Sequence, residues 1–256
     1  ITFAMLAILP VSYFEPRLVD FLPSLTFIEP YLWERALGTP VRAIDEAYWS
    51  LFIEVQFYLW ASLLFFVFGK ARFLASFTVF LNAVLLLMVA GALASSKSIL
   101  FLGDHVFAAS HLSWFGAGIA FFYLHLDRGN RLARLLAVET LTVSIAQALL
   151  RNAAAEIPYY LAFYALFVLF VFRRQWVRVF EWKPLTSAGE SSYSLYLLHQ
   201  NIGVTLIAVL GGGAGARWSA LAVPVVATIM VLLSLQIYRK WELPAKRKVL
   251  ELGRPA

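Results

Sequence analysis

The sequence predicts an all-α protein, a polytopic membrane helix bundle of about eight spans, and its composition and its apolar segments both point that way. Hydrophobic residues make up 61% of the 256 residues. Charged residues make up only 14%, against about 25% in an ordinary soluble domain. With a mean hydropathy of +0.77, the chain has too little polar surface to cover a core in water, which excludes a soluble globular domain. We therefore expect one membrane-embedded domain over residues 1–256.

Eight segments approach the roughly 20 apolar residues that a helix needs to cross the hydrocarbon core. The first, at 1–13, is predicted to be the end of a span, because Ile1 is not Met and no signal-peptide pattern surrounds it. We therefore expect the chain to lack its first helices. The proline-containing connection at 14–47 is predicted to be an interfacial loop. The other seven spans are predicted at 48–69, 73–95, 104–126, 132–150, 157–173, 191–211 and 217–238.

The basic residues predict the orientation, because Lys and Arg favour cytoplasmic loops. Of the 21 Lys and Arg residues, 15 fall on one side of the predicted topology and 6 on the other. The richer side includes the C-terminal end, which predicts a cytoplasmic C-terminus in a multi-pass protein of the cell inner (plasma) membrane. This bias accounts for the net charge of +6 without a nucleic-acid partner. The absence of Cys excludes disulfides, a thiolate nucleophile and a Cys-ligated metal.

Glu54 is the strongest candidate for a functional group inside the bilayer, where an ionisable side chain costs about 2.5–3.5 kcal/mol or more. It lies about 9 Å below the outer end of the predicted helix 48–69. Ser50 and Tyr58 fall one turn before and after it, so the three form one polar face, while Gln56 and Trp60 point elsewhere. The alternative is an interhelical hydrogen bond or ion pair that fixes packing.

A second candidate face lies on the predicted helix 191–211. Ser192, Tyr196 and His199 follow one another at i, i+4 and i+7, with His199 about 12 Å inside the membrane. A neutral histidine can act as a general base or as a hydrogen-bond partner. A packed histidine with satisfied hydrogen bonds is an equally good interpretation. No metal-ligand spacing includes it, so a metal site is not expected.

The predicted helix 104–126 carries a third set of polar and small residues. Asp104, His111 and Gly118 are spaced by seven and are expected to share a face, with His111 a possible substrate contact. Gly116 and Gly118 are expected to allow close approach of a neighbouring helix. In the next predicted span Glu139 is expected to pair with an arginine of another helix.

Four motifs resemble those of the acyltransferase-3 family of integral-membrane O-acyltransferases and follow that family's order. They are Trp49-Ser50-Leu51-x-x-Glu54-x-Gln56-Phe57-Tyr58-Leu59, Phe115-Gly116-Ala117-Gly118-Ile119-Ala120, Ser192-Tyr193-Ser194-Leu195-Tyr196-Leu197-x-His199 and Trp241-Glu242-Leu243-Pro244. Together they are spread over nearly the whole chain, from Trp49 to Pro244.

The resemblance implies a ten-helix fold and transfer of an acyl group, often acetyl, from cytoplasmic acyl-CoA to hydroxyls of carbohydrate or other envelope acceptors. No bound cofactor is implied, since acyl-CoA is a substrate. The family's catalytic histidine and a nearby arginine-rich motif lie on helices that have no counterpart in this chain, and ten helices less two leaves the eight spans predicted here.

The resemblance also implies roles for the candidate residues. Glu54 and His199 are expected to be catalytic. Substrate contacts are expected from Trp49, Ser50, Tyr58, His111, Ser192 and Tyr196. Cytoplasmic arginines are expected to receive the CoA phosphates, with Arg173, Arg174 and Arg178 as candidates.

Two other function classes fit a bundle with few buried polar residues. A multi-pass transporter or exporter of a polar solute would favour broken helices around a midplane site, in two related halves. The two halves of this sequence show no similarity, which counts against it. A non-catalytic membrane scaffold would not need Glu54 and His199 to converge.

Overall fold

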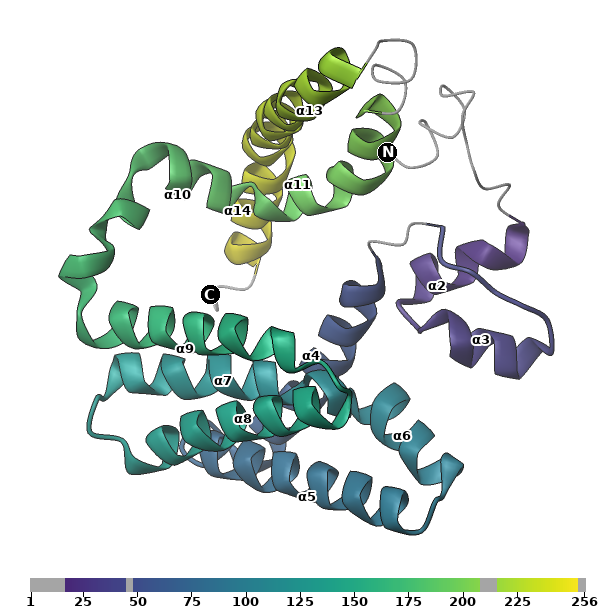
Figure 1. The fold of residues 1–256 in the computed structure, drawn as a ribbon, viewed down its shortest axis with the longest axis vertical. Coiled ribbons are helices and arrows are strands. Elements are labelled where there is room, and N and C mark those ends of the chain that lie inside the picture. The colour runs from purple at the N-terminus through teal and green to yellow at the C-terminus, as the bar shows by residue number, and fades with distance from the viewer. Residues whose placement is uncertain (1–16, 45–47, 208–215, 253–256) are drawn as a thin grey trace. The chain divides into compact units, whose positions relative to one another are not determined.

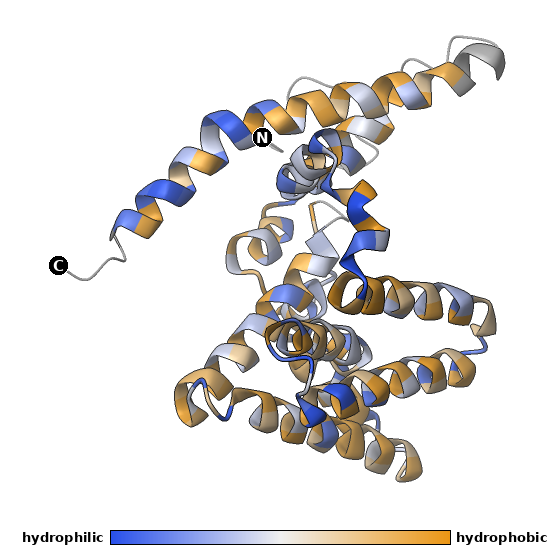
Figure 2. Ribbon diagram, turned by 90° about the vertical axis from the view of Figure 1, so that its left-hand side faces the viewer, coloured by the Kyte–Doolittle hydropathy of each residue, from blue (hydrophilic) through white to orange (hydrophobic). Residues whose placement is uncertain are grey.

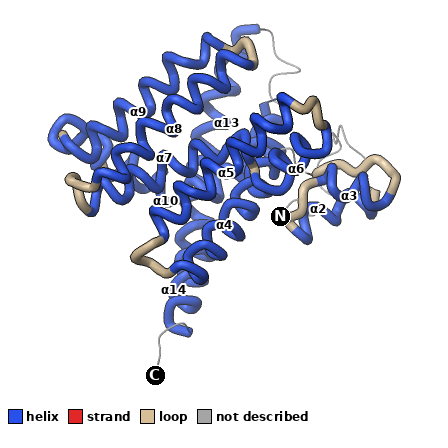
Figure 3. The backbone as a smooth tube through the Cα atoms, turned by 90° about the horizontal axis from the view of Figure 1, so that it is seen from below, coloured by secondary structure: helices blue, strands red, loops and turns tan. Residues whose placement is uncertain are grey.

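The structure is a computed structural model that describes residues 17–44, 48–207 and 216–252. Every regular element in these ranges is a helix, and they contain no strand (Figure 3). The chain divides into two compact units. One is Ser50–Arg178, here called the helical bundle; the other, the terminal unit, combines the described parts of Ile1–Trp49 and Val179–Ala256.

Six helical segments of the described ranges, one of them interrupted by a break, are long and apolar enough to cross a membrane. They are Trp49–Phe68, Phe73–Leu93, Lys97–Leu126, Arg131–Leu150, Ala154–Phe172 and Leu221–Glu251. This confirms a helical protein of membrane type but not a count of eight spans. The predicted span at 1–13 lies outside the described residues, and the one at 191–211 extends into 208–211, which are also outside them.

The helical bundle packs around α7, which contacts α5, α6, α8 and α9 (Figure 1). Its core is apolar and fully buried at Phe77, Leu81, Leu112 and Leu136. Outward-facing side chains such as Phe66 and Leu86 are also apolar and are exposed. The bundle consists of α4 (Trp49–Phe68), α5 (Phe73–Leu93), α6 (Lys97–Phe107), α7 (Ala109–Leu126), α8 (Arg131–Leu150), η3 (Ala154–Glu156) and α9 (Ile157–Phe172).

A chain that is apolar inside and outside cannot rely on the hydrophobic effect to associate its helices in lipid, so small residues and polar contacts decide the packing. Gly116 is one such residue. A Cβ atom there would lie 2.9 Å from Thr140 Cγ2 and 3.3 Å from Phe77 Cε1, so α7 approaches α5 and α8 closely. The expectation of a close helix approach is wrong at Gly118, which is exposed; a Cβ atom built there would have no neighbour within 4 Å.

Hydroxyl groups join three helices of the bundle below its apolar surface. The Tyr164 hydroxyl on α9 donates to Thr140 Oγ1 on α8 at 2.9 Å. One turn further along α8, Ser144 lies 3.2 Å from Ser113 Oγ on α7. Thr140 and Ser144 also donate to carbonyls one turn back in their own helix. Each hydroxyl therefore has a partner although all four residues are at most 6% exposed.

The predicted continuous helix at 104–126 is two helices in the structure. α6 ends at Phe107 and α7 starts at Ala109, because Ala108 has φ 51° and ψ 39° in the left-handed region. That conformation costs a non-glycine residue roughly 1–2 kcal/mol. The break removes the heptad relation between Asp104 and His111 that a continuous helix would give.

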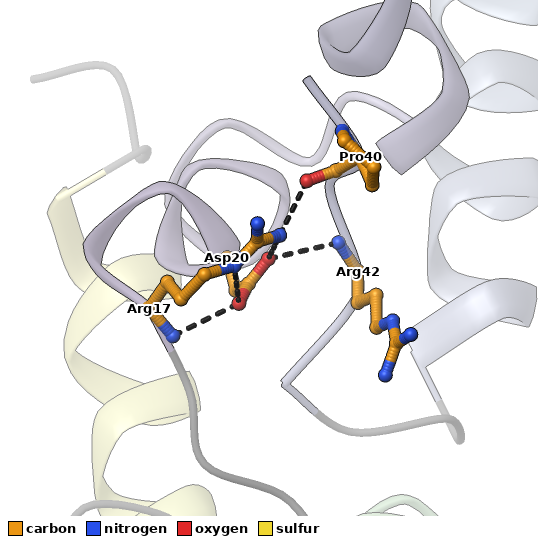
Figure 4. A network of polar contacts seen from close by, with 4 residues as sticks. All are labelled: Arg17, Asp20, Pro40 and Arg42. Carbon is orange, nitrogen blue, oxygen red and sulfur yellow. Dashed lines mark hydrogen bonds and ion pairs between the residues drawn. The ribbon is translucent and has the colours of Figure 1, made fainter.

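In the terminal unit, the described part of the 14–47 connection forms three short helices, none long enough to span a membrane. They are η1 (Leu18–Asp20), α2 (Phe21–Thr26) and α3 (Pro30–Leu37). Asp20, 1% exposed, closes this segment on itself: its carboxylate accepts the Arg17 guanidinium at 3.1 Å and the Arg42 backbone N–H at 3.0 Å (Figure 4). Arg17 also donates to the Pro40 carbonyl.

Burial by itself would raise the pKa of Asp20. The hydrogen bonds from the Arg17 side chain and from the backbone N–H groups of Arg42 and Arg17 outweigh burial, so the pKa is lowered. The carboxylate is therefore ionised at neutral pH, in the form that holds the loop closed.

The C-terminal part of the terminal unit contains two π-helical turns. A small core holds α11 to α13 through Leu198, Ile202, Val226 and Met230. The elements are η4 (Arg174–Glu181), which leads in from the bundle, then α10 (Lys183–Glu190), α11 (Ser192–Leu198), the π-turn η5 (His199–Gly203), α13 (Ala216–Ile237), the π-turn η6 (Tyr238–Glu242) and α14 (Leu243–Leu252).

The two glycines of α7 give a matched test of the packing. We expect Gly116→Leu to destabilise the protein by about 1–3 kcal/mol, because the new side chain meets Thr140 and Phe77. Gly118→Leu makes the same change in helix propensity where the new side chain meets no neighbour, and it should not destabilise the protein. Thermal unfolding of both purified variants in detergent checks this, and equal melting temperatures would contradict the close α7–α8 packing.

Candidate functional site

Helix α4, which carries the motif at 49–59, uses one face to hold the end of α6, just before the break at Ala108. Gln56 Nε2 donates to the His105 carbonyl at 2.9 Å, and Trp60 Nε1 donates to the Val106 carbonyl at 2.8 Å. The last carbonyls of any helix lack intrahelical partners, and lipid offers none. The sequence predicts that Gln56 and Trp60 point away from the Glu54 face. In the structure they point toward α6 and donate to two of its last carbonyls.

Aromatic rings reinforce the same contact. Trp60 lies 5.0 Å from Phe107 and 5.3 Å from Phe80, measured between ring centroids. One turn before, Phe57 stacks on Phe115 of α7 at 4.0 Å with an interplanar angle of 5°. Offset or stacked rings add about 0.5–1.5 kcal/mol per pair beyond buried area. This face of α4 is thus a structural contact along its length.

Glu54 lies on a different face and is not part of that contact. It is half-buried, and its carboxylate has no hydrogen-bond or ion-pair partner among the described residues. Ser50 and Tyr58 lie one turn away on either side, and Tyr58 is 59% exposed. Trp49, the first residue of α4, is 57% exposed. The face predicted from the sequence thus presents an acceptor carboxylate beside a serine and a tyrosine hydroxyl.

Asp104, His111 and Gly118, predicted to share one helix face, do not share one, because the helix breaks at Ala108. Asp104 accepts a hydrogen bond from Ser110 Oγ at 2.6 Å across the break. His111 follows in the first turn of α7, where its backbone N–H donates to the Ala108 carbonyl. The His111 side chain is half-buried.

Glu139 on α8 has one carboxylate oxygen that is buried without a hydrogen-bond partner. The ion pair expected with an arginine of another helix is not found in the described part of the chain. Among the buried side-chain oxygens of the described bundle, this is the one without a hydrogen-bond partner.

On α11 the structure brings two of the three predicted residues together. His199 Nδ1 lies 2.6 Å from the Tyr196 carbonyl, and their ring centroids are 5.5 Å apart. Because a carbonyl can only accept, Nδ1 is the donor of this contact, and in the neutral ring Nε2 then holds the lone pair. His199 is exposed and begins the π-turn η5. Ser192 lies seven residues earlier and is also exposed.

The buried polar face of α11 consists of residues that the sequence reasoning did not select. Ser194, 3% exposed, donates its hydroxyl to Glu242 Oε1 in η6. Ser234 on α13 donates to Ser191 Oγ at 3.3 Å, and both serines are fully buried. The signal was present as Ser191, Ser194 and Leu198 at i, i+3 and i+7, which is the spacing of one buried helix face.

The hydrogen bond between Ser194 and Glu242 links two of the four motifs, since Ser194 belongs to the motif at 192–199 and Glu242 to the one at 241–244. Each of these motif segments also overlaps a π-turn, a feature that occurs frequently at functional sites: His199 begins η5, and Glu242 ends η6. Glu54 belongs to the helical bundle and His199 to the terminal unit, so a shared cavity for the two stays a prediction. Within the described ranges, no three His, Asp or Glu side chains gather as metal ligands.

Comparison with known proteins gives no match: no family model, no curated protein and no solved structure matches this chain. The residues themselves therefore carry the functional interpretation.

Two serines of α11 separate the structural role from the proposed substrate role. We expect Ser194→Ala to lower the free energy of unfolding by about 1 kcal/mol, because Glu242 loses its donor. Ser192→Ala removes the same hydroxyl from an exposed position and should not change stability. Unfolding of both variants in detergent checks this. Equal stabilities would show that the Ser194–Glu242 hydrogen bond does not hold α11 to η6.

Proposed function

We propose that this chain is a membrane O-acyltransferase, or part of one, that moves an acyl group from acyl-CoA onto hydroxyls of a carbohydrate or envelope acceptor. Acetyl is the proposed group. The four motifs that resemble the acyltransferase-3 family supply the class. The observation that carries the proposal is the Glu54 carboxylate, half-buried in a candidate membrane span without a partner among the described residues.

Two other hydrogen-bonding side chains of α4 already have structural partners. Gln56 and Trp60 are accounted for by the carbonyls at the end of α6. Glu54 makes no such contact, yet a carboxylate at this depth is expensive to place in a bilayer. Glu54 combines this cost with a place in the motif at 49–59, and the combination favours binding or catalysis; Glu139 also lacks a partner for one oxygen but lies outside the four motifs.

The proposed reaction forms one bond and breaks one. The acceptor hydroxyl oxygen bonds to the thioester carbonyl carbon, the carbon–sulfur bond breaks, and the CoA thiolate leaves. A histidine takes the hydroxyl proton and delivers it to the leaving thiolate. The resemblance places that histidine on a helix with no counterpart here. Within this chain His199 is the candidate, through Nε2 of the neutral ring, and Glu54 would orient the acceptor or the imidazole.

The remaining candidates would bind substrate. Ser50 and Tyr58 flank Glu54 on α4, and Tyr196 adjoins His199. Trp49, Ser192 and His111 complete the proposed set. The CoA phosphates would meet basic residues on the proposed cytoplasmic side, for which Arg173, Arg174 and Arg178 are candidates. We propose the cell inner membrane, with a cytoplasmic C-terminus, from the bias of basic residues.

One observation favours the alternative of a transporter of a polar solute. The α6–α7 break at Ala108 resembles the discontinuous helices that line transporter sites. In those sites the freed carbonyls bind the ion or solute. Here the carbonyls of His105 and Val106 already accept hydrogen bonds from α4, which favours a structural break over a transport site.

The test is transfer of radiolabelled acetyl from acetyl-CoA to envelope glycans by membranes that contain the chain in its complete reading frame. Glu54→Gln should lower the rate on the order of 100-fold, because a misplaced acceptor or imidazole costs about that much. Glu139→Gln is the matched control, since it makes the same chemical change at the other intramembrane glutamate. Its rate should stay near that of the parent.

Full acetyl transfer by Glu54→Gln at equal protein level would overturn the role proposed for Glu54. If the parent itself transfers no label from acetyl-CoA or from longer acyl donors, the acyltransferase proposal fails. Uptake of labelled polar solutes into vesicles would then test the transporter.

A further inference from the structure

The C-terminal helix carries a cluster of basic residues that neither the fold nor the proposed reaction uses. α13, η6 and α14 run on as one long helix, and Leu221–Glu251 alone spans 31 residues. Figure 2 shows its colour change from apolar orange along α13 to hydrophilic blue toward the C-terminus. We call the five cations of this end the basic collar: Arg239, Lys240, Lys246, Arg247 and Lys248.

The length of the uncharged stretch places the basic collar at the membrane surface. Residues 218–238 contain no charged side chain. At 1.5 Å per residue these 21 residues cover about 32 Å, close to the roughly 30 Å of a hydrocarbon core. Arg239 and Lys240 therefore emerge among the lipid headgroups, next to Trp241, an interfacial residue type that is 74% exposed here.

The three remaining cations also reach the headgroups. Lys248 lies nine residues after Arg239, about 13 Å further along the helix. Side chains of a helix lean toward its N-terminus, and the N-terminal end of α14 faces the bilayer. The side chains of Lys246, Arg247 and Lys248 therefore lean back toward the lipid. Because the three are consecutive, they spread around the helix and form a ring rather than a stripe.

No protein group neutralises the basic collar in the described part of the chain. All five side chains are exposed, and none has an ion pair or a hydrogen bond with a described residue. Glu242, which lies among them in the sequence, accepts the Ser194 hydroxyl instead. Glu251 is also exposed and forms no ion pair with Arg247 four residues before it.

We propose that the basic collar binds the phosphate groups of anionic phospholipids at the membrane surface. Five unpaired cations at headgroup depth are complementary to such a lipid, and each Lys or Arg near an anionic surface strengthens the attraction about fivefold. Binding would fix the depth of the long helix that carries Glu242. The proposal depends on the membrane placement of this helix and not on acyl transfer.

The test uses a unique label, because the chain contains no Cys. Val249→Cys, at a position that is 68% exposed, carries a fluorophore, and the full chain is reconstituted in nanodiscs of phosphatidylcholine with phosphatidylglycerol. Quenching is measured with a headgroup nitroxide placed on either lipid at the same mole fraction. Nitroxide on phosphatidylglycerol should quench more strongly than nitroxide on phosphatidylcholine.

Removal of three charges by Lys246→Gln, Arg247→Gln and Lys248→Gln should weaken the affinity for phosphatidylglycerol on the order of 100-fold, so the difference in quenching between the two lipids should be lost. High salt should abolish it as well. The matched control removes three exposed cations of the helical bundle, by Lys70→Gln, Arg72→Gln and Arg131→Gln, and should keep the preference.

Equal quenching by the two lipids, or a preference that survives in the triple variant of the basic collar, would overturn the proposal. Inorganic phosphate at matched ionic strength separates lipid from soluble phosphate. The preference should persist in its presence. Its loss would assign the basic collar to soluble phosphate groups and overturn binding of lipid.

Discussion

A backbone that leaves the helical path in an apolar protein must find hydrogen-bond partners within the chain, because lipid provides none. The α6–α7 break is where this constraint is strongest. Ala108 adopts a left-handed conformation that is unfavourable for alanine, and the end of α6 presents carbonyls without intrahelical partners. Gln56 and Trp60 satisfy two of them from α4, so the first motif helix determines where the broken helix can sit.

The same division of roles recurs on both motif helices. On α4, the residues that hold the fold are paired, whereas Glu54 has no partner in the described structure. On α11, Ser191 and Ser194 are buried and hydrogen-bonded toward α13 and η6, whereas His199 is exposed. On α4 and around α11, the residues that hold neighbouring helices therefore lie on a different face from Glu54 and His199.

Hydropathy predicted the helical architecture well, because a run of apolar residues near bilayer length has few alternatives to a helix. It missed the break, because Ala108 is neither Gly nor Pro and the apolar pattern continues across it. It also missed the Ser194–Glu242 contact, because the two residues are 48 positions apart and only tertiary packing joins them. The Glu54 face and the separate direction of Gln56 followed from helical spacing alone.

The most direct test of this account is hydrogen exchange across the break in the double variant Gln56→Leu with Trp60→Phe, reconstituted in lipid. Both changes leave an apolar side chain in place and remove the two donors to α6. We predict faster exchange in α6 and the first turn of α7, with α8 and α9 unchanged, and a stability loss of about 1–2 kcal/mol. Exchange and stability equal to those of the parent would contradict the claim that α4 holds the broken helix.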